Sequence, residues 1–230
     1  MRKNKMMRAA SALMVAVLLT TCTISGTFAK YVSSETGTDT ARVAKWGVVV
    51  EADSFGMFKT DYETTDTTAT FSGAYSVSSA EGDRDKVLAP GTSGSFADIA
   101  ITGTPEVAVN VEIKPTVAVT GDWTVAGDFY CPVVVTVGTE EISGLDYTSA
   151  AAFAEAIADE LEGKSAQYAP NKDLGAIYNN TNLDLAWAWA FEGAAGSKQT
   201  DAKDTALGDK AVAGDLTISI GVEITVTQID

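Results

Sequence analysis

The chain has 230 residues, of which 31 are acidic, 16 are basic and none is histidine, so its formal net charge is −15. So acidic a chain repels nucleic acid and anionic lipid surfaces, which excludes both as expected partners. The lack of histidine removes the commonest general base and the commonest metal ligand. With no phosphate loop and no dinucleotide fingerprint either, the sequence predicts neither an enzyme nor a cofactor.

The first 29 residues have the three parts of an export signal. Four basic residues lie within the first eight, an uncharged and mostly apolar run fills 9–24, and small residues lead to Ala29. This order is typical of a cleaved secretory signal peptide. We therefore expect a peptidase to cut between Ala29 and Lys30, and the product to be secreted to the cell surface or extracellular matrix.

Two other outcomes stay open for this segment. The uncharged stretch 9–29 is long enough to cross a bilayer, so an uncleaved N-terminal anchor is the first alternative. Cys22 suggests lipidation, although Thr20 and Thr21 before it are larger than a lipoprotein site prefers. Membrane contact is expected through this segment only.

Cleavage leaves 201 residues with 12 basic and 31 acidic side chains, a net charge of −19. That length suffices for one domain with a sizeable core. One cysteine remains, Cys131, so no intrachain disulfide is expected. Cys131 precedes the apolar run 133–135 and is interpreted as a small core residue; an intermolecular bridge is the alternative.

Residues 30–42 form a polar tail whose only large apolar side chains are Tyr31 and Val32. Such a segment buries too little surface to repay its ordering, and we expect it to be mobile. Residues 43–51 predict the first strand, with Trp46 and Val50 on one face together with Val48.

Residues 78–85 predict a surface loop that contains three alternating acidic side chains, Glu81, Asp83 and Asp85. They are weak candidates for calcium ligands, because the EF-hand spacing is absent. The alternative is a solvated acidic loop. A turn is predicted at residues 90–94 from Pro90, Gly91 and Gly94.

Three runs alternate apolar and polar residues and predict strands. The first covers 107–119, the second centres on 133–137, and the third covers 216–229. Pro115 interrupts the first run, and because proline has no amide hydrogen we expect it at a sheet edge or a bulge.

One amphipathic helix is predicted over residues 149–161. Phe153, Ile157 and Leu161 recur every four residues and form an apolar stripe. Thr148 or Ser149 is the expected N-cap, and Gly163 is expected to end the helix. The stripe predicts a helix that covers a sheet.

Residues 183–191 predict a strand with Trp187, Trp189 and Phe191 on one face. These rings suggest a carbohydrate-binding platform, but alanines on the other face favour close packing in a core. Residues 193–214 predict a loop with a helical turn around 201–207.

Together these patterns predict an all-β fold with one inserted amphipathic helix. Residues 43–230 are expected to form an antiparallel β-sandwich.

Several segments resemble the TasA/camelysin family of bacterial matrix and surface proteins, in a clostridial-type branch. The sequence SGTFAKYVSS around the cleavage site is similar to signals cut by SipW-type peptidases. Further similar segments are LAPGTSGSF, ITGTPEVAVNVEI, YCPVVV, WAWAFEG and the C-terminal ITVTQID.

The resemblance implies a jelly-roll fold, export by a SipW-type peptidase, and a fibre of the biofilm matrix. Each subunit would donate its tail, residues 30–42, to the sheet of the next, with Tyr31 and Val32 as anchors. The metallopeptidase activity attributed to camelysin-type relatives does not carry over to a chain without histidine. The alternative is a monomeric surface or adhesive module with a spacer tail.

Overall fold

The computed structural model describes residues 41–52, 56–64, 75–79, 86–96, 99–178, 183–211 and 216–229. Antiparallel strands outweigh helices among these residues, which confirms the all-β class in its coarse form. Val43–Asp230 is one compact unit, and Met1–Arg42 is assigned to a second. Within the described ranges no helix is both long and apolar enough to cross a bilayer.

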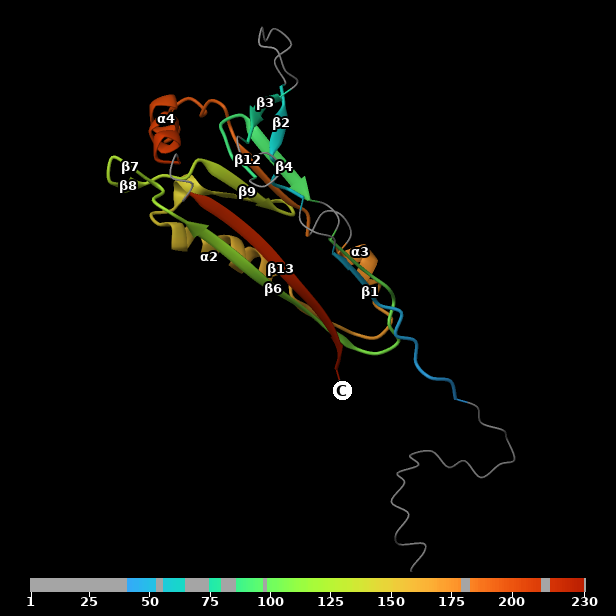
Figure 1. Ribbon diagram of the computed structural model, residues 1–230. Coiled ribbons are helices and arrows are strands. Elements are labelled where there is room, and N and C mark those ends of the chain that lie inside the picture. Colours follow the sequence, from blue (N-terminus) through green and yellow to red (C-terminus); the bar gives the residue numbers. More distant parts are fainter. Residues whose placement is uncertain are drawn as a thin grey trace, which may run out of the picture. The chain divides into compact units, whose positions relative to one another are not determined.

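A four-stranded sheet is built around β12 (Leu185–Trp189), which lies between β9 and β4 (Figure 1). The strand order is β10 (Glu140–Ser143), β9 (Val133–Val137), β12 and β4 (Thr92–Phe96). Trp187 pairs with Val135 on one side and Gly94 on the other. The strand predicted over 133–137 is confirmed.

A three-stranded sheet contains the two longest strands, β6 (Val109–Thr120) and β13 (Thr217–Gln228). They pair over their full length, from Val109↔Gln228 to Thr120↔Thr217, and form one long ribbon (Figure 1). Period-two alternation predicted both strands, and both are confirmed with ends shifted by a residue or two. The short β11 (Ala166–Tyr168) pairs with the start of β6.

Pro115 lies inside β6, the middle strand of this sheet. Its pairing with Val222 is in register, so the predicted bulge is wrong. The missing donor is tolerated because β11 pairs only with residues 109–111 of β6. At Pro115 the only described partner strand is β13, so the predicted edge holds locally.

Three pairs of short strands complete the described sheets. Strand β1 (Val49–Ala52) pairs with β5 (Ile99–Thr102), and β2 (Asp61–Glu63) pairs with β3 (Tyr75–Ser78). Strands β7 (Thr124–Val125) and β8 (Asp128–Phe129) form a small hairpin. Ser78 therefore ends a strand and does not begin the acidic loop as predicted.

The predicted helix is present as α2 (Ala150–Glu162) and packs on β6. The side chain of Ser149 accepts a hydrogen bond from the amide of Ala152 at 3.1 Å, and Gly163 is the C-cap. Phe153, Ile157 and Leu161 are completely buried, as the stripe predicted.

The prediction of a single helix is wrong, because α3 (Leu174–Tyr178), α4 (Asp201–Lys210) and the 3-10 turn η2 (Gly144–Asp146) are also present. The helical turn predicted around 201–207 is confirmed and continues to Lys210. A polar sequence hid the length of α4, since Leu207 is the one apolar side chain it buries.

Gly94 lies in β4 and not in a turn, whereas the turn at Pro90 and Gly91 is confirmed. Because Gly94 has no side chain, the carbonyl oxygen of Met57 can lie against it. A methyl group at this position would overlap that oxygen. The indole nitrogen of Trp187 donates to that same oxygen at 2.8 Å. Close packing between layers thus explains this glycine.

Candidate functional site

The residues singled out from the sequence as a site lie outside the described ranges. This is true of the cleavage pair Ala29 and Lys30 and of the anchors Tyr31 and Val32. It is equally true of the acidic triplet, Glu81, Asp83 and Asp85. Within the described part of the chain, no three acidic or cysteine side chains are grouped closely enough to hold a metal ion.

The carbohydrate platform predicted as an alternative on β12 is wrong, because Trp187 and Trp189 are 2% and 6% exposed. Core packing is confirmed for both. Phe191 departs from the pattern: β12 ends at Trp189, and Phe191 is 71% exposed. It does not share the buried face as the alternation predicted.

Cys131 is fully buried beside Val133, which confirms the interpretation as a core residue. Burial raises the pKa of its thiol to about 12, against a smaller opposing effect of a hydrogen bond with the Val133 backbone. Gly144 lies so close that a side chain there would overlap Cys131. A bridge to another molecule would first require this part of the core to open.

A cavity of about 690 Å³ lies beside α4. Its wall combines apolar side chains with one buried carboxylate, that of Asp204. The Tyr130 hydroxyl donates to Asp204 Oδ1 at 2.5 Å, and Gln199 Nε2 donates to Oδ2 at 2.9 Å. The main lining residues are Phe58, Trp123, Trp189, Asp204, Leu207 and Ile218.

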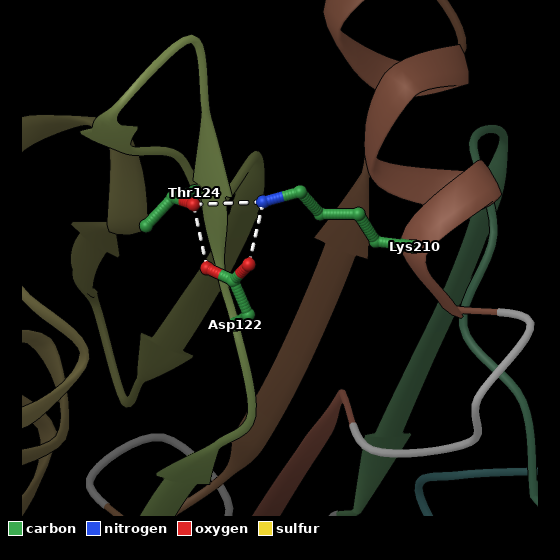
Figure 2. Close-up of polar contacts among 3 residues, drawn as sticks. All are labelled: Asp122, Thr124 and Lys210. Carbon is green, nitrogen blue, oxygen red and sulfur yellow. Dashed lines mark hydrogen bonds and ion pairs between the residues drawn. The ribbon is translucent and has the colours of Figure 1, made fainter.

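The C-terminal end of α4 is attached to the β7–β8 hairpin by a cluster of polar contacts (Figure 2). Lys210 Nζ lies 2.7 Å from Asp122 Oδ2 and 2.8 Å from Thr124 Oγ1. The Lys210 hydrogen bond, followed by one from Thr124, lowers the pKa of Asp122. Asp204 lies in the first turn of α4 and Lys210 at its end. Their contacts therefore hold both ends of α4, the helix that lines the cavity.

Two further polar groups are the Tyr130 hydroxyl, which contacts Asp204, and the Trp189 indole, which lines the cavity. Burial, and then the hydrogen bond to Asp204, raises the pKa of Tyr130 far above its ordinary 10.0, so its hydroxyl stays protonated at neutral pH. Trp189 Nε1 has no hydrogen-bond partner among the described groups, but it is closed off from solvent. A ligand in the cavity does not reach this donor unless the wall moves.

The segment that leads into β1 differs from the cavity, because most of its apolar side chains are exposed. The strand predicted over 43–51 is only partly correct, since β1 begins at Val49. Val49 and Val50 are neighbours and so point to opposite faces, yet they are 49% and 38% exposed. Their partners on β5 are Thr102, which is exposed, and Ile101, which is fully buried.

The residues before β1 are held in place despite having no regular structure. The amide of Lys45 donates to Glu106 Oε2 at 2.9 Å, and the amide of Glu106 donates to the Lys45 carbonyl oxygen at 2.8 Å. Gly47 has a left-handed φ of 57°, and its carbonyl oxygen lies against Gly103 where a side chain would overlap it. Trp46 therefore projects from a backbone that is fixed on both sides.

In the half of the β6 and β13 ribbon that contains Val111 and Ile113, the apolar side chains of β13 are less buried than those of β6. On β6, Val111 and Ile113 are at most 1% exposed, whereas their partners Val226 and Ile224 on β13 are only partly buried. Among the described strands, β13 pairs with β6 alone, so its other edge is open. A 12-residue edge with a half-covered apolar row is a surface to which another strand can be added.

Comparison with family models, with curated proteins and with solved structures finds no match for the chain.

Proposed function

We propose that this chain is an exported structural protein that polymerises head to tail, by donation of residues 30–42 to the sheet of a neighbouring subunit. The observation that carries the proposal is the open edge of β13 with its half-covered row of apolar side chains. The tail has 13 residues, close to the 12 residues of β13. The TasA-like segments of the sequence agree with this role.

Added strands obtain affinity from main-chain hydrogen bonds and specificity from alternate side chains. A tail strand beside β13 would satisfy the outer row of backbone groups along that edge. Its inward side chains would cover Val222, Ile224 and Val226, which are partly buried without it. Because the outer face of β13 is polar, with Thr217, Ser219 and Glu223 exposed, a polar tail suits the solvent side of such a strand.

A head-to-tail contact uses two different surfaces of each subunit, so it leaves one of each free at the ends and propagates into a fibre. The net charge of −19 on the cleaved chain opposes this association, and salt is therefore expected to promote it. Because the chain has no histidine, an acid-triggered transition is expected at about pH 4–5, in the carboxylate range. A midpoint near about 6.5 would contradict that expectation.

Deletion of residues 30–42 tests the proposal. The chain that begins at Val43 should remain folded and monomeric, whereas the chain that begins at Lys30 should form filaments visible by electron microscopy. A finer test compares two double variants. Tyr31→Ser combined with Val32→Ser removes the anchors, whereas Thr36→Ser combined with Thr38→Ser preserves them. Filaments that persist after the deletion would refute tail donation.

The cavity beside α4 supports a second candidate, a monomeric surface module that holds a ligand. This module would have the tail as a spacer or, if the signal remains uncleaved, as the connection to a membrane anchor. It predicts a monomer at every concentration and salt, with or without residues 30–42. Sedimentation velocity of the two chains separates the candidates.

A further inference from the structure

The ribbon of β6 and β13 has two long edges, and each is open over part of its length (Figure 1). Among the described strands, β13 pairs with β6 alone, and β11 covers the outer edge of β6 only at residues 109–111. An open edge presents unpaired backbone groups to which another strand can be added, and natural sheets often protect such an edge with proline. The two edges of this ribbon differ in the groups that they present.

Two hydrogen bonds show which residues of β6 point away from β13. The amide of Ile113 donates to the hydroxyl of Ser165, which directly precedes β11, at 2.9 Å. On the opposite side, the carbonyl oxygen of Ala108 accepts from the amide of Ile229, which directly follows β13, at 2.9 Å. Because the backbone groups of successive residues point to opposite edges, the odd-numbered residues of β6 point outward. The nitrogen of Pro115 therefore lies on the outer edge of β6.

Beyond β11, few groups on the outer edge of β6 remain for another strand. The Ser165 hydroxyl contacts both backbone groups of Ile113, at 2.9 Å from the nitrogen and 3.5 Å from the oxygen. Pro115 has no amide hydrogen. Within this strand, only Val117 and Val119 then present both a donor and an acceptor to the outside.

The outer edge of β13 has no such interruption. Even-numbered residues of β6 pair with odd-numbered residues of β13, as Lys114 does with Glu223. The even-numbered residues of β13 therefore point outward, and none of them is proline. They are Ile218, Ile220, Val222, Ile224, Val226 and Gln228. A strand added along β13 can bond to all six, whereas one added along the open part of β6 finds two residues with both groups.

We propose that Pro115 prevents strand addition along β6, so that this sheet receives a strand only along β13. Burial does not distinguish the two edges, because Val117 and Val119 on β6 are partly buried, as Val222 on β13 is. The missing amide of Pro115, next to the position that Ser165 occupies, is the difference between them. The inference rests on the proposed function for the identity of the added strand, which is the tail of a second copy.

This specificity determines the form of the assembly. A subunit that donates one tail and receives one tail has one neighbour at each end, so its fibre is unbranched. A second receiving edge on β6 would let one subunit bind two tails and would create branch points. Pro115 therefore keeps the fibre linear.

The experiment adds a synthetic peptide of residues 30–42 to the chain that begins at Val43 and measures amide hydrogen exchange by NMR. Pro115→Val restores the amide and keeps an apolar side chain with high strand propensity. Thr116→Val is the control, because it places the same side chain on the next residue, whose amide points to β13. At saturating peptide, exchange at Val117 and Val119 should slow about tenfold or more in Pro115→Val only. In the chain that begins at Lys30, electron micrographs of Pro115→Val should show branched filaments.

The outward amides of β13 separate the possible results. If the peptide protects them in every chain and protects Val117 and Val119 only in Pro115→Val, the inference is supported. If it protects them but leaves Val117 and Val119 open in folded Pro115→Val, the inference fails while tail donation stands. Protection of Val117 or Val119 in the unmodified chain would also overturn the inference, whether or not the variant folds. If the peptide protects no amide of the unmodified chain, both proposals fail together.

Discussion

The layer of α2 on β6 and the segment 43–50 contain the same kinds of side chain but differ in how far they bury them. In the layer, Phe153 and Ile157 lie against β6 and are fully buried. In the segment 43–50, Val49 and Val50 point to opposite sides of the short strand β1 and remain exposed. The difference indicates that the side chains of the layer stabilise the fold, whereas those of residues 43–50 contribute less to it.

The largest predicted effect tests the folding half of this comparison. Phe153→Ala should lower the free energy of unfolding by about 3–5 kcal/mol, because it removes a buried ring and leaves a cavity. Val43→Ala, in the segment 43–50 at a position that is 92% exposed, should change it by no more than about 0.5 kcal/mol. Chemical denaturation of the two variants measures both changes in the free energy of unfolding. Equal losses would contradict the distinction between buried and exposed apolar residues.

The rate of cysteine labelling tests the same contrast between buried and exposed positions. Cys131 should resist a maleimide at neutral pH in the native protein, because its thiol is buried and its pKa is about 12. A cysteine introduced by Val43→Cys, at a position that is 92% exposed, should be labelled rapidly. Mass spectrometry of the labelled protein identifies the modified site, and rapid native labelling of Cys131 would contradict its placement in the core.

The same raised pKa values predict a loss of stability at alkaline pH. In the unfolded chain Cys131 ionises near its ordinary 9.0, whereas in the folded chain it holds its proton to about 12. Tyr130 and Tyr178 are shifted in the same direction, chiefly by burial. The folded state therefore binds more protons over this window, and the melting temperature should fall as pH rises above about 9.

The smallest effect is predicted at the polar contacts between Asp122 and Lys210 (Figure 2). The lowered pKa of Asp122 means that its contribution is present above its ordinary 3.8 and is lost as pH falls through the lower native value. Asp122→Asn should lower the melting temperature slightly at neutral pH, because exposed ion pairs contribute little. The difference from the unmodified chain should vanish in strong acid, and a constant difference would contradict this assignment.

The sequence predicted those parts of the fold in which periodic apolar spacing and burial agree. Helix α2 and strands β6, β9 and β13 have such spacing. The pattern failed at Phe191, because β12 ends before it, and at Gly94, where the approach of Met57 explains a glycine that suggested a turn. Helix α4 buries one leucine, so spacing gave little indication of its length.

The candidate surfaces depend on tertiary structure more strongly. Alternation showed which residues of β13 share a face, but not that its burial would be weaker than that of β6. Likewise, the apolar residues of 43–50 predicted an ordinary buried strand. Only the pairing of β1 with β5 alone among the described strands leaves them exposed. Burial of this kind is decided by neighbours distant in sequence, which local patterns do not encode.

Tail donation is tested most directly by adding the chain that begins at Val43 to the chain that begins at Lys30. A tail-less subunit retains the edge of β13 and can receive a tail, but it has none to pass on, so it should end every filament that it joins. Mean filament length in electron micrographs should then fall steadily as the tail-less fraction rises. Filaments of unchanged length, or tail-less subunits incorporated along them, would contradict the account.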